Sequence, residues 1–211
     1  MFVFSRKQNL SATKPLQPRR RPKQERARLT QQAILDAFVR LLLEKGYARL
    51  TIRDIANLAG VGLGTVYEHF PSKKAIAANC IHLRFKGVAV EAQACIAASQ
   101  GRSTGEMIDA LLDLFVAVHR VQPLEWSALI FLERQVSDEA AWRALYAHFV
   151  DLWRRALLAS GQADEEGARE AAYAIHAAVY GFLYQTLMLR PEFVATPLFR
   201  QQLGVLVRGL A

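Results

Sequence analysis

Residues 51–74 read TIRDIANLAGVGLGTVYEHFPSKK and hold two short helical patterns on either side of a glycine-bearing break at residues 59–62. The first pattern places an apolar residue at each position of one helical face: Ile52, Ile55, Ala56 and Ala59. Thr51 can cap this helix with its hydroxyl, and Asp54 suits the positive end of the helix. Two short helices joined by a tight turn that contains glycine are typical of a helix-turn-helix. Such a motif sets its second helix into the major groove of DNA.

A longer helical pattern precedes this motif. We expect a helix over about residues 24–44, which Gly46 ends as a C-terminal capping glycine. In the second helix of the motif, Val66 and Phe70 share one face, and Pro71 ends the helix. The three helices are predicted to form a small bundle with this core: Phe38, Leu42, Ile52, Ile55, Val66 and Phe70.

This part of the sequence resembles the DNA-binding signature of the TetR family of bacterial transcriptional regulators. The resemblance covers residues 29–79, and its densest part reads IA..AGV...T.Y.HF..K. It implies an all-α fold, with an N-terminal three-helix helix-turn-helix domain and a larger helical-bundle domain for ligand binding and dimerisation. We therefore expect a DNA-binding domain over residues 23–79 and an effector-binding and dimerisation domain over residues 80–211.

The resemblance also implies roles for individual residues at a DNA surface. Four match positions that usually hold phosphates: Thr51, Tyr67, His69 and Lys73. Four match positions that face base edges: Arg53, Leu63, Gly64 and Thr65. Arg53 could pair with guanine, and Leu63 and Thr65 could touch thymine methyl groups. Gly62 departs from the family pattern, which commonly has Ser there, so one hydroxyl contact to phosphate is lost.

Positive charge is concentrated at the N-terminus. Residues 1–28 carry nine Lys or Arg and one acid, for a net +8, whereas residues 29–211 carry 18 residues of each sign. Residues 1–22 also hold three of the seven prolines, and this composition predicts a flexible basic arm. The arm could lie along phosphates or enter a minor groove. The alternative is a solvated tail that only raises non-specific affinity for DNA.

Six further helices are predicted after the motif. The first begins after Ser72, a suitable N-cap, and continues to about Ser99 as the connection between the two domains. The others are expected at about residues 104–121, 124–136, 138–160, 164–190 and 196–210. No stretch alternates apolar and polar residues over a useful length, so no strand is predicted.

Aromatic residues are frequent in the second domain, and several carry a polar atom. Apolar walls with a few such groups are typical of a small-molecule pocket, and the family resemblance implies an effector pocket in this domain. We predict that five residues line it: Trp126, Phe149, Trp153, His176 and Tyr180. The alternative for each residue is an ordinary place in the core.

The last two predicted helices carry small and apolar residues. In the family, the corresponding pair forms a four-helix interface between two subunits. The resemblance therefore implies a homodimer with these interface residues: Ala177, Gly181, Phe199, Leu203 and Leu206. The alternative is that these faces pack only within one subunit.

Other functions are disfavoured by the motifs that the sequence lacks. It shows no nucleophile elbow, phosphate loop or metal signature, so we expect no catalytic residue, cofactor or metal. No apolar run reaches the roughly 18 residues that span a bilayer, and the first ten residues lack a secretory cleavage signature. Cys80 and Cys95 are not expected to form a disulfide, so a reducing cytoplasm is predicted.

These observations favour a transcriptional repressor that binds a palindromic operator in double-stranded DNA and is released by a small apolar or aromatic effector. A second interpretation is a structural or nucleoid DNA-binding protein with the same fold, in which the basic arm supplies most of the binding. That protein would show little sequence preference and no response to an effector.

Overall fold

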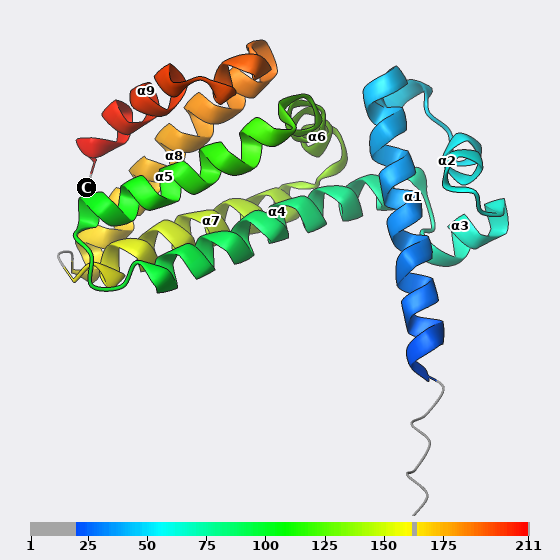
Figure 1. The fold of residues 1–211 in the computed structure, drawn as a ribbon, viewed down its shortest axis with the longest axis horizontal. Helices are drawn as coiled ribbons and strands as arrows, with labels where there is room; N and C mark the ends of the chain where they lie inside the picture. Colours follow the sequence, from blue (N-terminus) through cyan, green and yellow to red (C-terminus); the bar gives the residue numbers. More distant parts are fainter. Residues whose placement is uncertain (1–19, 162–163, 211) are drawn as a thin grey trace, which may run out of the picture.

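The computed structural model describes residues 20–161 and 164–210. Within these ranges the chain forms nine α-helices, one 3-10 helix and no strand, so the predicted all-α fold is confirmed. The elements are α1 Arg20–Arg49, α2 Ile52–Ala59, α3 Leu63–His69, α4 Lys73–Ala98, α5 Thr104–Val121, α6 Pro123–Val136, α7 Glu139–Ala159, α8 Glu165–Leu189, η1 Pro191–Ala195 and α9 Pro197–Arg208. Figure 1 shows α1–α3 at one end and the bundle of α5–α9 at the other, with α4 running between them.

Helix α1 is longer than the sequence predicted. It begins at Arg20, ahead of the expected Gln24, because Pro22 lies in the first turn, where a missing N–H costs no hydrogen bond. Gly46 has a φ of 75° and interrupts the helix where we expected it to end. A final turn then continues to Arg49. The predicted arm lies outside the described residues, except that the backbone of residues 20–22 belongs to α1.

The small bundle of α1–α3 has nearly the core that was predicted. Five of the six expected residues are buried: Phe38, Leu42, Ile55, Val66 and Phe70. Ile52 is only half-buried, because it opens α2 at the edge of the bundle. Leu50, which precedes α2, is 1% exposed and takes its place in the core.

Helix α4 connects the two ends of the molecule. Ser72 caps it, accepting a hydrogen bond from the backbone N–H of Ala75 at 3.1 Å. Its 26 residues span about 39 Å at about 1.5 Å per residue. It contacts α1 at its beginning and α5, α6 and α7 along its length. Helix α4 is therefore in contact with both bundles.

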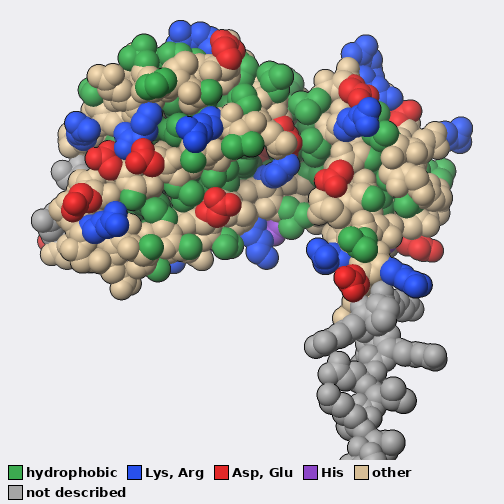
Figure 2. Space-filling view, viewed as in Figure 1, with side chains coloured by type: hydrophobic (Ala, Val, Ile, Leu, Met, Phe, Trp, Pro, Cys, Tyr) green, Lys and Arg blue, Asp and Glu red, His purple; other side chains and the backbone are tan. Residues whose placement is uncertain are grey.

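The second bundle consists of α5–α9 packed along α4 (Figure 1). The six helices predicted after the motif all appear, with ends within two residues of the expected positions. The sequence did not predict η1, which forms between Pro191 and Pro197 and buries Val194 completely. None of the described helices is long and apolar enough to cross a membrane. On the face seen in Figure 2, acidic and basic side chains are mixed over both bundles, with small apolar patches between them.

Candidate nucleic-acid interface and internal cavity

The beginning of α2 is held by a capping box. Thr51 Oγ1 accepts from the backbone N–H of Asp54 at 3.1 Å, and Asp54 Oδ2 accepts from the backbone N–H of Thr51 at 2.8 Å. Lys45 Nζ lies 2.8 Å from the same Asp54 oxygen and so ties α2 to the end of α1. These hydrogen bonds, from Lys45 first and then Thr51, lower the pKa of Asp54 to about 2. The orientation of α2 against α1 is therefore set by a local network.

The turn between α2 and α3 depends on Gly60. Its φ of 69° lies in the left-handed region, and its N–H donates back to the carbonyls of Ala56 and Asn57. Gly62 then opens α3 without a side-chain cap, as its lack of a hydroxyl predicted. The turn is thus fixed by backbone conformation, and α3 leaves it at a defined angle.

Most of the residues predicted to contact DNA lie on the surface of α2 and α3. Five are exposed: Thr51, Arg53, Leu63, Gly64 and Tyr67. Thr65 and His69 are half-buried on α3. Leu63 and Tyr67 are 38% and 51% exposed, although each could bury apolar area in a folded core. An exposed leucine and tyrosine on one short, well-supported helix are suited to contact with a partner surface.

The eighth residue, Lys73, makes contacts within the chain that the sequence did not predict. Its ammonium group donates to the carbonyls of Tyr47 and Leu50 at 2.9 and 3.1 Å, and it lies 4.4 Å from the centroid of the Tyr47 ring. Two of its three donors therefore hold the first turn of α4 against the end of α1. Sequence reasoning found the residue but missed this connection, because both acceptors are backbone groups more than 20 positions away.

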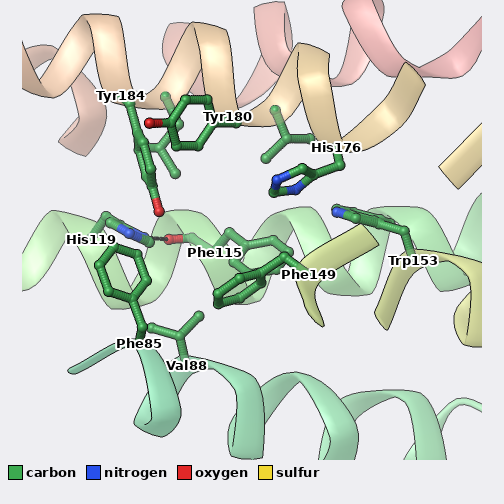
Figure 3. A pocket seen from close by; sticks show the side chains of 11 residues that line it. Phe85, Val88, Phe115, His119, Phe149, Trp153, His176, Tyr180 and Tyr184 are labelled. Carbon is green, nitrogen blue, oxygen red and sulfur yellow. Dashed lines mark hydrogen bonds between the residues drawn. The ribbon is translucent and has the colours of Figure 1, made fainter. Parts of the chain in front are cut away.

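The second bundle encloses a small cavity with aromatic walls (Figure 3). Its volume is about 20 Å³, room for about one water molecule. It is lined by Phe85, Val88, Phe115, His119, Phe149, Trp153, His176, Val179, Tyr180, Leu183 and Tyr184. Four of the five predicted pocket residues are thus brought together: Phe149, Trp153, His176 and Tyr180.

Trp126 is not among the residues that line the cavity. It lies behind the wall, with its ring 4.3 Å from that of His119, and donates its indole N–H to the carbonyl of Val118 at 3.3 Å. Its prediction as a lining residue was wrong, because helical phase marks a residue as buried without showing what it faces. Trp126 instead supports the position of His119.

The cavity contains polar atoms that lack partners. His119 Nδ1 donates to the carbonyl of Phe115 at 2.7 Å (Figure 3), which leaves its Nε2 as an acceptor. Nε2 of His119 and Nε2 of His176 are both buried with no hydrogen-bond partner among the described residues. Burial lowers the pKa of each histidine to about 4. Both rings are therefore neutral at pH 7. His119 was not among the pocket residues that the sequence predicted.

A much larger groove lies beside this cavity. It measures about 860 Å³ and runs between α4 and the facing parts of α6 and α7. Phe85 lines both the groove and the cavity, so the two spaces are adjacent at this side chain. The sequence did not predict the groove, because it forms between helices that are distant along the chain.

Two of the predicted dimer contacts are corrected by the structure. Phe199 and Leu203 are both 0% exposed, inside their own chain. Phe199 stacks on Phe182 with centroids 5.0 Å apart. The physical reason is that α9 folds back across α5 and α8, where Arg200 pairs with Asp109 at 2.8 Å.

The other three predicted interface residues remain on or near the surface. Ala177 is exposed, Gly181 is half-buried and Leu206 is 47% exposed. Further apolar side chains that were not predicted are exposed on the same two helices: Tyr173, Met188, Leu198 and Val205. The outer surfaces of α8 and α9 therefore still expose apolar side chains, and those of α9 are residues other than Phe199 and Leu203.

Comparison with known proteins agrees with this arrangement. Residues 34–80 match the family model described as bacterial regulatory proteins, tetR family. The HTH-type transcriptional regulator CymR from Pseudomonas putida is 43% identical over 58 residues, which are 28% of this chain and 29% of CymR. The sequence match thus spans less than a third of that relative.

Solved structures resemble nearly the whole chain. The fatty acid degradation regulator FadR from Bacillus halodurans has a TM-score of 0.70 at 19% identity, covering 86% of this chain and 96% of FadR. SmeT in its complex with triclosan has a TM-score of 0.62 at 23% identity, covering 86% of this chain and 89% of SmeT. At these identities the likeness shows a common fold. Residues 34–80 thus match the tetR family of bacterial regulatory proteins, and the rest of the chain shares its fold with FadR and SmeT.

Proposed function

We propose that the chain is a homodimeric transcriptional repressor that binds a palindromic operator through α2 and α3 and is released by a small apolar or aromatic effector. The observation that carries this proposal is the exposed surface of α3, with Leu63 and Tyr67 in solvent on a helix whose position is fixed from behind. Such a repressor works on DNA in the bacterial cytoplasm.

The proposed contacts divide into two kinds. Arg53 on α2 and Leu63, Gly64 and Thr65 on α3 would face base edges and supply sequence preference. Thr51, Tyr67 and His69 would meet phosphates and set the register of the protein on the duplex. Lys73 has one donor left after its two carbonyl contacts, and that donor is available for a phosphate.

Dimerisation is proposed through the exposed apolar surfaces of α8 and α9, including Ala177, Gly181 and Leu206. One recognition helix makes few base contacts, so a monomer would bind weakly and with little preference. A two-fold dimer places two such helices about 34–36 Å apart, or a multiple of that distance, and therefore requires a palindrome.

The aromatic cavity is the proposed effector site. The SmeT structure holds triclosan, an aromatic molecule, in a protein of the same fold, and this supports an aromatic effector here. A cavity of about 20 Å³ must expand to admit such a molecule, and its wall includes Phe85 of α4. Lys73, at the start of the same helix, is tied to the end of α1. Expansion of the cavity would shift α4 and so change the position of α1–α3.

A second connection supports the same route. Arg84, next to Phe85 on α4, forms an ion pair with Glu125 in the first turn of α6. Helix α6 also contacts α1 directly. A shift of α4 therefore has two ways to reach the DNA-binding bundle, one along its own axis and one through α6.

Footprinting on genomic DNA fragments tests the proposal. A regulator protects a bounded site with two half-sites related by a two-fold axis, and competitor DNA of other sequence does not remove the protection. The structural or nucleoid interpretation rests on the net +8 of residues 1–28 and predicts protection without boundaries. Unbounded protection at every protein concentration would refute the repressor proposal.

A further inference from the structure

Glu133 on α6 is a buried acid at the edge of the aromatic cavity. It is 5% exposed, and its Oε1 atom is buried with no hydrogen-bond partner in the part of the chain that the structure describes. No described Lys, Arg or His lies within ion-pair distance of its carboxylate. A buried carboxylate oxygen without a partner is costly unless something donates to it. The structure therefore leaves an acceptor here for a group that it does not itself supply.

Glu133 belongs to the same site as the aromatic cavity. It lines a second small cavity of about 10 Å³, which shares five wall residues with the first: Phe85, Phe149, His176, Tyr180 and Tyr184. Glu133 also lines the wide groove, as do Phe85 and Leu145. These three side chains thus form the partition between the groove and the enclosed space. A ligand can approach along the groove and meet Glu133 as it enters.

Several polar atoms of the combined cavity are buried without a hydrogen-bond partner in the described chain, and two of them, Glu133 Oε1 and His119 Nε2, are acceptors. Glu133 Oε1, His119 Nε2 and His176 Nε2 are all buried and lack partners among residues 20–161 and 164–210. Glu133 is the only acidic residue lining the two small cavities, and no Lys or Arg lines them. The rest of the wall is largely aromatic, with six Phe, Trp or Tyr rings around the first cavity. Aromatic faces attract cations, and a carboxylate pairs with them.

We infer that the effector is an aromatic molecule with a cationic, hydrogen-bond-donating group, such as a primary amine or an amidine, whose charge pairs with Glu133. This inference rests on the proposed effector role of the cavity. The aromatic part of the ligand displaces Phe85 and lies among Phe115, Phe149 and Trp153. The cationic group stays near the partition and donates to Glu133 Oε1, which has no hydrogen-bond partner within the described part of the chain.

Three naphthalene probes of the same size test this inference by isothermal titration calorimetry on the full chain at pH 7. They are 1-naphthylmethylamine, which is cationic, 1-naphthalenemethanol, which is neutral, and 1-naphthylacetate, which is anionic. We expect the amine to bind about 10-fold or more tightly than the alcohol, because a hydrogen bond to a charged group exceeds one between neutral groups. We expect the anion to bind most weakly. Equal or tighter binding of the anion, or no saturable binding of the amine, would overturn the inference.

The variant Glu133→Gln sharpens the test. It should weaken binding of the amine by about 10- to 100-fold and leave the alcohol within about threefold. Glu166→Gln, which removes an equal charge from the exposed first turn of α8, is the matched control and should change neither affinity. A Glu133→Gln protein with native helicity that keeps its preference for the amine contradicts the inference. If this variant does not fold, the comparison of the three probes on the wild-type chain still decides.

Footprinting on the same wild-type samples separates this inference from the proposed function. A protein that protects a bounded palindrome but prefers the anion remains a regulator and refutes the cationic effector. A protein that prefers the amine but protects no bounded site retains the ligand site and refutes the repressor.

Discussion

The capped helix pair α2–α3 and the aromatic cavity treat their polar groups in opposite ways. At the beginning of α2, the polar atoms of Thr51 and Asp54 find partners three residues apart, and Lys45 completes the set. In the cavity, the Nε2 atoms of His119 and His176 are buried and have no hydrogen-bond partner among the described residues. The first region is complete as it stands and presents a rigid outer surface. In the second, buried polar atoms have no partner within the described chain, and such atoms require an explanation because most buried polar groups are hydrogen-bonded.

The two regions also differ in how far apart along the chain their residues lie. Residues 51–74 contain their own caps, turn and helix end, so a change there acts first on a local element. The cavity draws its wall from α4, α5, α7 and α8, so a change there acts on the packing of several helices at once.

The largest effect is expected from charges placed inside the second bundle. Phe199→Glu combined with Leu203→Glu puts two carboxylates at positions that are 0% exposed. Each unpaired buried charge costs several kcal/mol, so the second bundle should lose cooperative folding. Circular dichroism during thermal unfolding measures this loss.

The matched control for that pair lies on the outer surface of the same helix. Val205→Glu with Leu206→Glu changes side chains that are 67% and 47% exposed, so the chain should remain folded. Analytical ultracentrifugation should then show more monomer than in the wild type. A folded monomer from the Phe199 and Leu203 variant would contradict the position of α9 in the structure.

The second effect is a loss of stability at acidic pH. Burial lowers the pKa of His119 and His176 to about 4, whereas histidine in an unfolded chain titrates near 6.5. The unfolded chain therefore binds more protons between these values, and the free energy of unfolding falls as the pH falls. Each histidine should contribute a loss of about 2 kcal/mol between pH 7 and pH 5.

Urea unfolding at pH 7 and pH 5 measures this dependence. The carboxylates whose pKa the fold lowers, Asp54, Glu106 and Asp151, have ordinary pKa values below pH 5 and so contribute little to this difference. His176→Phe should reduce the difference between the two pH values by about half, because one of two similar groups is removed. Stability that is unchanged between pH 7 and pH 5 would show that the two rings are accessible to protons in the folded chain.

A smaller effect is expected where α4 is tied to α1. Lys73→Met removes two hydrogen bonds from an ammonium group to the carbonyls of Tyr47 and Leu50 and should cost about 1–3 kcal/mol. Lys74→Met removes the same charge from an exposed neighbour and should stay within about 0.5 kcal/mol of the wild type. Urea unfolding compares the two variants. Equal stabilities would mean that Lys73 acts only toward DNA.

The smallest effect is a gain. Gly62 has φ and ψ values of −67° and 148°, which any residue can adopt, and a Cβ there would meet only the Thr65 hydroxyl oxygen at 3.8 Å. Gly62→Ser should therefore supply the missing cap of α3 and add a few tenths of a kcal/mol to stability. It also offers a hydroxyl to phosphate, so affinity for the operator should rise in gel-shift titrations. Gly62→Ala, which adds a Cβ without a hydroxyl, should not raise this affinity.

Features that depend on neighbouring residues could be predicted from the sequence, whereas features that depend on distant residues could not. The capping box of Thr51 and Asp54 and the turn at Gly60 could be predicted, because each depends on residues within a few positions. Four of the eleven residues that line the cavity were also predicted, from aromatic content and the family resemblance. Trp126 was misplaced, because a buried ring behind the wall and one in the wall have the same spacing.

The remaining errors concern partners that are distant along the chain. Phe199 and Leu203 form an apolar face that looks the same whether it packs within a subunit or between two, and only the path of α9 decides. The hydrogen bonds from Lys73 to two backbone carbonyls could not be predicted, because any residue type can supply a carbonyl. The carboxylate oxygen Oε1 of Glu133, which lacks a partner among the described residues, could not be found from the sequence either, because this property depends on how the helices pack.

Whether α2 and α3 read the operator is tested by the affinities of the wild type, Arg53→Ala and Arg102→Ala for an operator and its single-base variants. Arg53 lies exposed on α2, whereas Arg102 lies exposed in the loop after α4, remote from the motif. If α2 and α3 read the operator, Arg53→Ala loses about 1–3 kcal/mol through one base position and stops discriminating there. Arg102→Ala then keeps both the affinity and the preferences of the wild type. An equal loss from the two variants on every sequence would contradict a reading role for this helix pair.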